Sequence, residues 1–133
     1  MDKLFVPREL IAEILAHCKE CYPYEACGIL AGQFGVSKKI YKIKNIEKSS
    51  VSYMMEPGEQ FTVMKEMREQ GLEMTAIYHS HPVSSAYPSP KDVSLAFYQD
   101  SVYVIVSLVN DEPLIKAFEI KDDIIKEIEI IYS

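Results

Sequence analysis

The stretch Val102-Tyr103-Val104-Ile105-Val106-Ser107-Leu108 decides the fold class. Every position except Ser107 is apolar and most are β-branched or aromatic, so the stretch predicts a strand that is buried on both faces inside a sheet. Two apolar runs follow it, at 114–120 and 124–131, and both are expected to be strands. The faces of the last strand are expected to separate isoleucines from glutamates, with Ile124, Ile128 and Ile130 opposite Glu127 and Glu129.

The chain before this strand alternates helical and extended patterns. Helices are expected over residues 8–20, 58–70 and 90–99. In the second of these, Phe61, Met64 and Met67 recur at i, i+3 and i+6, and Met64 and Met67 are expected to pack in the core. Strands are expected over 3–6, at a sheet edge, and over 26–31, 38–46 and 74–79. The sequence therefore predicts a single domain over residues 1–133 of class α/β (α+β), a mixed β-sheet flanked by helices.

The composition limits the classes of function. The chain has 133 residues, 48% of them hydrophobic, and a formal net charge of −6, which fits one folded domain and excludes a disordered chain. No nucleic-acid partner is expected, because phosphate contacts require a positive surplus. No membrane association is expected either, because no apolar run approaches the roughly 20 residues of a membrane helix and no secretory signal follows Met1. Three cysteines without a signal peptide favour a reducing, cytoplasmic location.

These cysteines are expected to be structural. Cys18 and Cys21 form a C-x-x-C pair beside His17, but a structural zinc site would require a fourth ligand and usually a second pair. The pair also falls at a helix end, whereas redox pairs sit at strand–helix junctions. We therefore expect core or surface cysteines there, and a small buried residue at Cys27.

Two histidines stand together in His79-Ser80-His81-Pro82. Residues i and i+2 of an extended chain point to the same side, so both imidazoles are presented at the end of a strand. Asp92 follows eleven residues after His81, and the intervening loop is long enough to return it to the imidazoles. Two histidines and one carboxylate leave a fourth tetrahedral position for water, as a catalytic zinc requires. The same donor set also suits Fe(II).

The segment Ser89-Pro90-Lys91-Asp92 is equally a helix start. Ser89 fits the N-cap, Pro90 the first helical position and Asp92 the third, where a carboxylate closes a capping box. Taken alone, this tetrapeptide favours the cap. The two interpretations are compatible, because a helix N-terminus would fix Asp92 in space as a ligand.

At this point the sequence resembles the JAMM (MPN+) metalloprotease family. The spacing His79-Ser80-His81-Pro82, six residues, Ser89-x-x-Asp92 matches that family's motif, and Glu25 in Glu25-Ala26-Cys27-Gly28 matches its upstream acid. The resemblance implies a cytidine-deaminase-like JAMM/MPN fold. The compact chain is similar to the bacterial members that act on ubiquitin-fold sulfur-carrier proteins, and it lacks the long insertions of the eukaryotic deubiquitinating members.

The resemblance also implies roles for individual residues. His79, His81 and Asp92 would ligate Zn²⁺, Glu25 would act as the general base, and Ser89 would stabilise the oxyanion. The implied reaction is hydrolysis of the amide bond after a Gly-Gly-type tail of a ubiquitin-like carrier, with release of cysteine. A non-catalytic MPN-type scaffold and a non-haem Fe(II) enzyme stay open as alternatives, and the sequence does not give the oligomeric state.

Two surface features complete the expectations. Met54 and Met55 precede Pro57 in an extended segment, and one of them is expected to face outward beside the site. A basic run interrupts the acidic chain at Lys38, Lys39, Lys42, Lys44 and Lys48. We favour a lysine-protected edge strand here; the alternative is a patch for an acidic partner such as a ubiquitin-fold carrier.

Overall fold

The computed structural model describes residues 2–133. Along these residues the strands are β1 (Lys3–Val6), β2 (Cys27–Gln33), β3 (Val36–Ile43), β4 (Glu73–His81), β5 (Val102–Ser107), β6 (Leu114–Lys121) and β7 (Ile124–Tyr132). The helices are α1 (Arg8–Cys21), α2 (Pro57–Glu69) and α3 (Pro90–Ser94). Among the described residues, no helix combines the length and the apolar composition that a membrane crossing requires.

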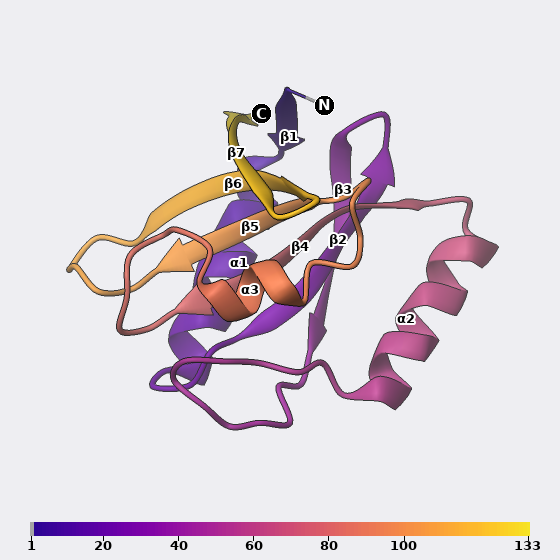
Figure 1. The fold of residues 1–133 in the computed structure, drawn as a ribbon. Helices are drawn as coiled ribbons and strands as arrows, with labels where there is room; N and C mark the ends of the chain where they lie inside the picture. The colour runs from indigo at the N-terminus through magenta and orange to yellow at the C-terminus, as the bar shows by residue number, and fades with distance from the viewer. Residues whose placement is uncertain (1) are drawn as a thin grey trace.

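The strands form one mixed sheet whose two ends meet through β1 (Figure 1). The order is β1-β3-β2-β4-β5-β6-β7, with β4 and β5 parallel at the centre and antiparallel pairs on either side of them. β1 pairs in parallel with β7 from Lys3 to Val6 and with β3 at the single pair Phe5–Val36. The predicted mixed sheet is confirmed, but the prediction that 3–6 lies at a sheet edge is wrong, because β1 closes the sheet into a barrel.

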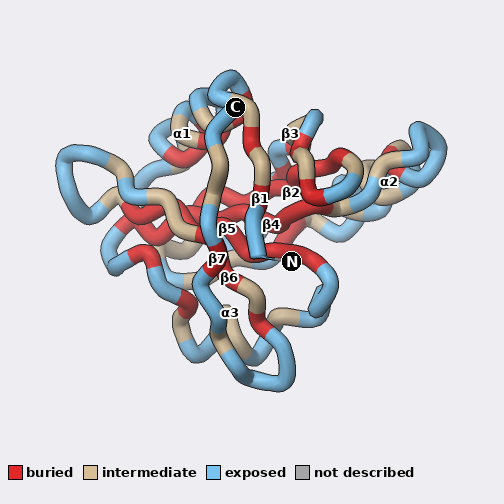
Figure 2. Tube along the Cα trace, turned by 90° about the horizontal axis from the view of Figure 1, so that it is seen from above, coloured by how far each residue is buried: buried red, intermediate tan, exposed pale blue. Residues whose placement is uncertain are grey.

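Both faces of the sheet are packed. On one face, Leu10, Ile14 and Cys18 of α1 belong to the same hydrophobic cluster as the even-numbered valines of β5. On the other, Tyr103 and Ile105 of β5 pack with Phe118 and with Met67 of α2. Every residue of β5 is buried, as the sequence predicts, and buried positions concentrate along the central strands in Figure 2. This central position makes β4 and β5 a rigid base for side chains at the end of β4.

One local prediction is wrong. The helix expected to run to residue 99 ends at Ser94. Beyond it the Ala96 amide donates to the Val93 carbonyl (3.3 Å) and the Tyr98 amide to the Tyr103 hydroxyl (3.0 Å), so the i→i−4 pattern stops.

Of the two methionines expected in the core, Met67 is buried and Met64 is half-buried, while Phe61 is 70% exposed, because α2 touches the sheet at its rim. Ile124, which alternation along β7 places on one face with Ile128, is 71% exposed because it flanks the tight β6–β7 turn.

The basic run lies on an open strand edge. β3 pairs with β2 along its length but with β1 only at Val36, so Lys38–Ile43 has no second strand partner among the described residues. Lys39 caps part of this edge through an ion pair with Glu66 of α2 (3.0 Å). This arrangement agrees with a lysine-protected edge.

Candidate metal centre

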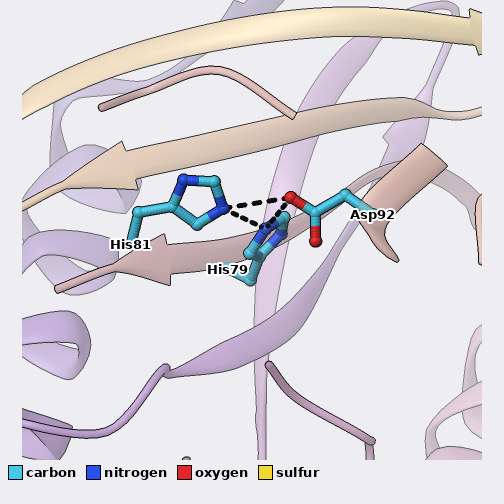
Figure 3. A group of neighbouring side chains, drawn as sticks. All are labelled: His79, His81 and Asp92. Carbon is cyan, nitrogen blue, oxygen red and sulfur yellow. Dashed lines mark hydrogen bonds and ion pairs between the residues drawn. The ribbon is translucent and has the colours of Figure 1, made fainter. Parts of the chain in front are cut away.

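Three side chains from two segments converge at the end of β4 (Figure 3). His79 and His81 are 1% and 2% exposed, and their Nε2 atoms lie 3.1 Å apart. Oδ2 of Asp92, from the start of α3, lies 3.2 Å from Nε2 of His79 and 3.0 Å from Nε2 of His81. The structure thus brings together the two histidines and the carboxylate that the sequence proposes as ligands.

The strand register fixes the two imidazoles. His79 pairs with Cys27 of β2 on one side and with Ile105 of β5 on the other, and His81 pairs with Ser107 of β5. Because both residues alternate with Ser80 on one strand, their side chains leave the sheet on the same face. Ser80 points the other way and accepts a hydrogen bond from the Ala26 amide (2.8 Å).

The helix cap fixes the carboxylate. The Asp92 amide donates to Oγ of Ser89 (3.0 Å), and the Ser89 amide donates to Oδ2 of Asp92 (2.9 Å), which completes a capping box. The cap predicted from Ser89-Pro90-Lys91-Asp92 is therefore present, and it holds the carboxylate in a position where it meets the histidines. The two interpretations of this segment describe one arrangement.

The partners of the two Nδ1 atoms differ between the histidines. Nδ1 of His81 lies 2.7 Å from the Ser85 carbonyl oxygen. Since a carbonyl oxygen only accepts, this nitrogen carries a proton, and Nε2 is the ring nitrogen that faces Asp92 and would meet a metal once it has lost its own proton. The His79 ring stacks on Tyr53 at 4.7 Å between centroids, and its Nδ1 finds no hydrogen-bond partner within residues 2–133.

The electrostatics suit a cation between these groups. Burial opposes the charge on Asp92, but hydrogen bonds from His79 and His81 outweigh burial and hold the pKa of its carboxyl below the ordinary value. Burial lowers the pKa of His79, which favours the neutral imidazole that binds metals. For His81, burial is outweighed by the hydrogen bonds to Asp92 and Ser85, so its pKa is raised.

The geometry fits a tetrahedral ion. Ligand atoms about 2.0–2.1 Å from a tetrahedral centre stand roughly 3.3 Å from one another. The three donor atoms here are 3.0–3.2 Å apart, so a small outward shift is enough to admit an ion. The described residues therefore contain a group able to hold a metal.

Glu25 is buried next to this group. It precedes β2, is 3% exposed, and its Oε1 has no hydrogen-bond partner among the described residues. Burial raises the pKa of Glu25 to about 8, while the charges on His81 and Asp92 act on it in opposite directions. Its backbone is held from both sides: the Glu25 amide donates to the Ser49 carbonyl (2.8 Å), and the Glu25 carbonyl accepts from Nδ2 of Asn45 (3.0 Å).

Ser89 lies beside the carboxylate and is half-buried. Because its Oγ accepts from the Asp92 amide, the hydroxyl proton is free to donate to another group. Cys27 lies next to His79 in the sheet, but its thiol donates to the Ile43 carbonyl (3.4 Å), so it is occupied within the strands. Cys18 and Cys27 are buried, and all three cysteines are free thiols, as expected of structural cysteines.

A mainly apolar cavity of about 320 Å³ opens beside His79 and Asp92. Met54 lines it and is 50% exposed, whereas Met55 is 8% exposed, so one methionine faces outward as predicted. Tyr53 and Asn45 also shape the site, and sequence reasoning assigned a role to neither. Only the position of Tyr53 in the extended approach to α2 hinted at proximity, while Asn45 carries no signal in the sequence.

Comparison with known proteins places this geometry in a family. A sequence model described as prokaryotic homologs of the JAB domain matches residues 7–121. The chain belongs to this family. Its resemblance to the JAMM/MPN proteins, drawn above from the motif, is confirmed. The protein named CysO-cysteine peptidase from Mycobacterium tuberculosis is 38% identical over 106 residues, which cover 78% of this chain and 73% of the relative.

Further relatives agree with this Prok-JAB assignment. The probable TtuB-protein conjugate cleaving protease of Thermus thermophilus is 36% identical over 94 residues, covering 70% of this chain and 63% of the relative. A protein of Desulfitobacterium hafniense has a solution structure with a TM-score of 0.88 at 36% identity, covering 98% of this chain and 92% of that one. The JAB1/MPN domain protein AF2198 of Archaeoglobus fulgidus shares the fold, with a TM-score of 0.63 at 22% identity over 96% and 99% of the two chains.

Proposed function

We propose that this chain is a zinc-dependent peptidase of the JAMM type. It hydrolyses the amide bond after the Gly-Gly-type tail of a ubiquitin-like sulfur-carrier protein, with cysteine as the leaving residue. The observation that carries the proposal is the convergence of His79, His81 and Asp92 with a buried acid, Glu25, beside them. Relatives named as a CysO-cysteine peptidase and as a TtuB-protein conjugate cleaving protease support the substrate class.

His79, His81 and Asp92 would hold the zinc. When bound, it would act as a Lewis acid toward the amide carbonyl and increase the acidity of a water molecule. The cap at Ser89 holds Asp92, the Ser85 carbonyl holds His81, and stacking on Tyr53 holds His79 before the metal arrives. Side chains that are already positioned lose little conformational freedom when the metal binds, so the affinity for the metal is higher.

Glu25 would move the protons. Its burial, and an Oε1 that has no partner within residues 2–133, fit a base that takes a proton from water and delivers it to the departing amine. In the balanced reaction the C–N bond breaks, a C–O bond to the water oxygen forms, and the tail ends as a carboxylate. Ser89, whose hydroxyl proton is free, would donate a hydrogen bond to the carbonyl oxygen as negative charge develops there.

A cleavage assay tests this function. The purified protein is analysed for zinc and incubated with a carrier whose tail carries a C-terminal cysteine. We expect release of cysteine, loss of release with a chelator, and recovery with Zn²⁺. Release should be the same without oxygen, which separates hydrolysis from Fe(II) chemistry. If the zinc-loaded protein binds carriers but cleaves none, the chain is a scaffold and the proposal is wrong.

The organisation as one domain over residues 1–133 is part of the same proposal. The family model covers 7–121, and β1 and β7 pair with each other at the two ends of the described chain. Limited proteolysis tests it. Cleavage into two separately stable fragments would contradict it.

A further inference from the structure

A single lysine accompanies the candidate metal ligands. Lys91 precedes Asp92 and lines the same cavity as His79 and Asp92, and it is the only Lys or Arg among the described residues that line this cavity. Its Nζ lies 3.1 Å from Oε1 of Glu47, which belongs to the loop between β3 and α2. The ammonium group is therefore presented at the cavity rim with a carboxylate already on it.

The Lys91–Glu47 pair lies between two hollows of the surface. Lys91 lines the first, with His79 and Asp92. The residues around Glu47 in the chain, Lys44, Asn45 and Lys48, line the second, together with Glu25. The charges of both members of the pair also act on Glu25. The pair thus stands close to the base on one side and to the candidate ligands on the other.

Another carboxylate can replace Glu47 in this ion pair. The side chains of Lys91 and Glu47 are 46% and 30% exposed, and exposed pairs of this kind add little to stability. Glu47 also accepts a hydrogen bond from the Ser52 hydroxyl, which gives its carboxylate a second partner if Lys91 is taken. A competing carboxylate with better geometry can therefore replace Glu47 on Lys91.

The proposed reaction brings such a carboxylate to the site. A leaving residue that ends the chain carries its α-carboxylate one carbon away from the scissile nitrogen. That carboxylate must therefore lie within a few ångströms of the reacting atoms, close to the residues that flank Asp92. A protein or peptide continuing beyond this residue would place a neutral amide there instead.

We propose that Lys91 binds the α-carboxylate of a single-residue leaving group, and that Glu47 holds this position until the substrate arrives. The inference rests on the proposed function and assigns the residue that recognises the single terminal residue to be removed. Lys91 then determines specificity, because only a substrate with a free terminal carboxylate pairs with its ammonium group.

Two matched substrates separate recognition of the terminal carboxylate from the hydrolysis itself. One is a carrier tail ending in cysteine and the other is the same tail ending in cysteinamide, which differ only in the terminal charge. For the unaltered protein we expect higher kcat/KM on the acid. Lys91→Met should lower kcat/KM on the acid by about 10- to 100-fold, the size expected for a hydrogen bond to a charged group, and leave the amide within twofold. Lys91→Arg should keep the preference for the acid.

Two further variants control the comparison. Lys126→Met removes an equally short exposed ion pair, 3.0 Å to Asp2, at a lysine that lines neither hollow, and should change neither substrate. Glu47→Gln removes the competing carboxylate and should lower KM for the acid or leave it unchanged.

Three results would overturn the inference. Equal losses on both substrates in Lys91→Met would assign Lys91 to carrier contact or to support of the site. Equal losses of kcat/KM on both substrates in Glu47→Gln would mean that the Lys91–Glu47 pair only supports the structure. Unchanged kcat/KM of Lys91→Met on both substrates would mean that Lys91 has no role in substrate recognition. If the unaltered protein cleaves neither substrate, the proposed function itself fails, which is distinct from cleavage without a preference for the acid.

Discussion

Burial of the Glu25 carboxyl predicts a pH-dependent stability of the metal-free protein. Burial raises the pKa of Glu25 to about 8 from an ordinary value of 4.5. Below pH 4.5 the group is protonated in both the folded and the unfolded chain and costs nothing. As the pH rises from 4.5 to 8, the unfolded chain ionises first, and the folded state loses stability relative to it.

The magnitude follows from the size of the shift. At about 1.4 kcal/mol for each pKa unit, the full cost approaches roughly 5 kcal/mol above pH 8. Between pH 6 and pH 8 the loss is about 2 kcal/mol. Glu25→Gln keeps the shape and removes the charge, so the stability of the unaltered protein relative to this variant should fall by that amount over this interval.

Urea unfolding in the presence of a chelator measures the difference. His79, His81 and Asp92 are common to both proteins, so their titration largely cancels. Glu112→Gln, at an exposed loop position, controls for the loss of one negative charge. With Zn²⁺ present the difference should shrink, because a nearby dication favours the ionised carboxylate. Parallel pH profiles of the two proteins in chelator would refute the reasoning.

Three other substitutions test the packing and the cap. Gly28→Ala would place a Cβ 2.3 Å from Cε2 of Tyr78 and 2.5 Å from the Tyr41 carbonyl oxygen, so it should destabilise the fold by about 1–3 kcal/mol; an unchanged Tm would contradict this. Tyr78→Phe removes the hydroxyl that lies 2.6 Å from Nδ1 of buried His17 and should cost about 1–3 kcal/mol in urea unfolding; no measurable cost would mean that His17 finds another partner. Ser89→Ala should lose about 1 kcal/mol of stability and at least about 100-fold in kcat, and a loss of stability alone would leave Ser89 with only the cap.

Local patterns predict most of the fold. The unbroken β-branched run of β5 specifies a strand buried on both faces, and helical spacing after Pro7 specifies α1. The role of β1 is not predictable from its four residues, because closure depends on pairing with β7 at the far end of the chain. The early end of α3 is not predictable from local spacing either, because the amides after it donate to nearer carbonyls and, at Tyr98, to the Tyr103 hydroxyl of β5.

The candidate site also has residues that local patterns predict and residues that they do not. Alternation along one strand places His79 and His81 together, and the cap motif locates Asp92 at the start of a helix. Spacing in the sequence cannot connect Glu25 to these residues, because Glu25 comes near them only when β2, which follows it, pairs with β4 in the folded sheet. The family resemblance supplied that connection. The support from Asn45 arises from a loop that has no periodic pattern, so the sequence gives no indication of it.

The zinc coordination tests the central claim most directly, and X-ray absorption at the zinc edge of the reconstituted protein measures it. With His79, His81 and Asp92 as ligands, one zinc per chain should be surrounded by nitrogen and oxygen atoms at about 2.0–2.2 Å, with the signature of two imidazoles and no sulfur. His81→Ala should lower the zinc content. A sulfur shell at about 2.3 Å would assign the metal to the cysteines and contradict the account.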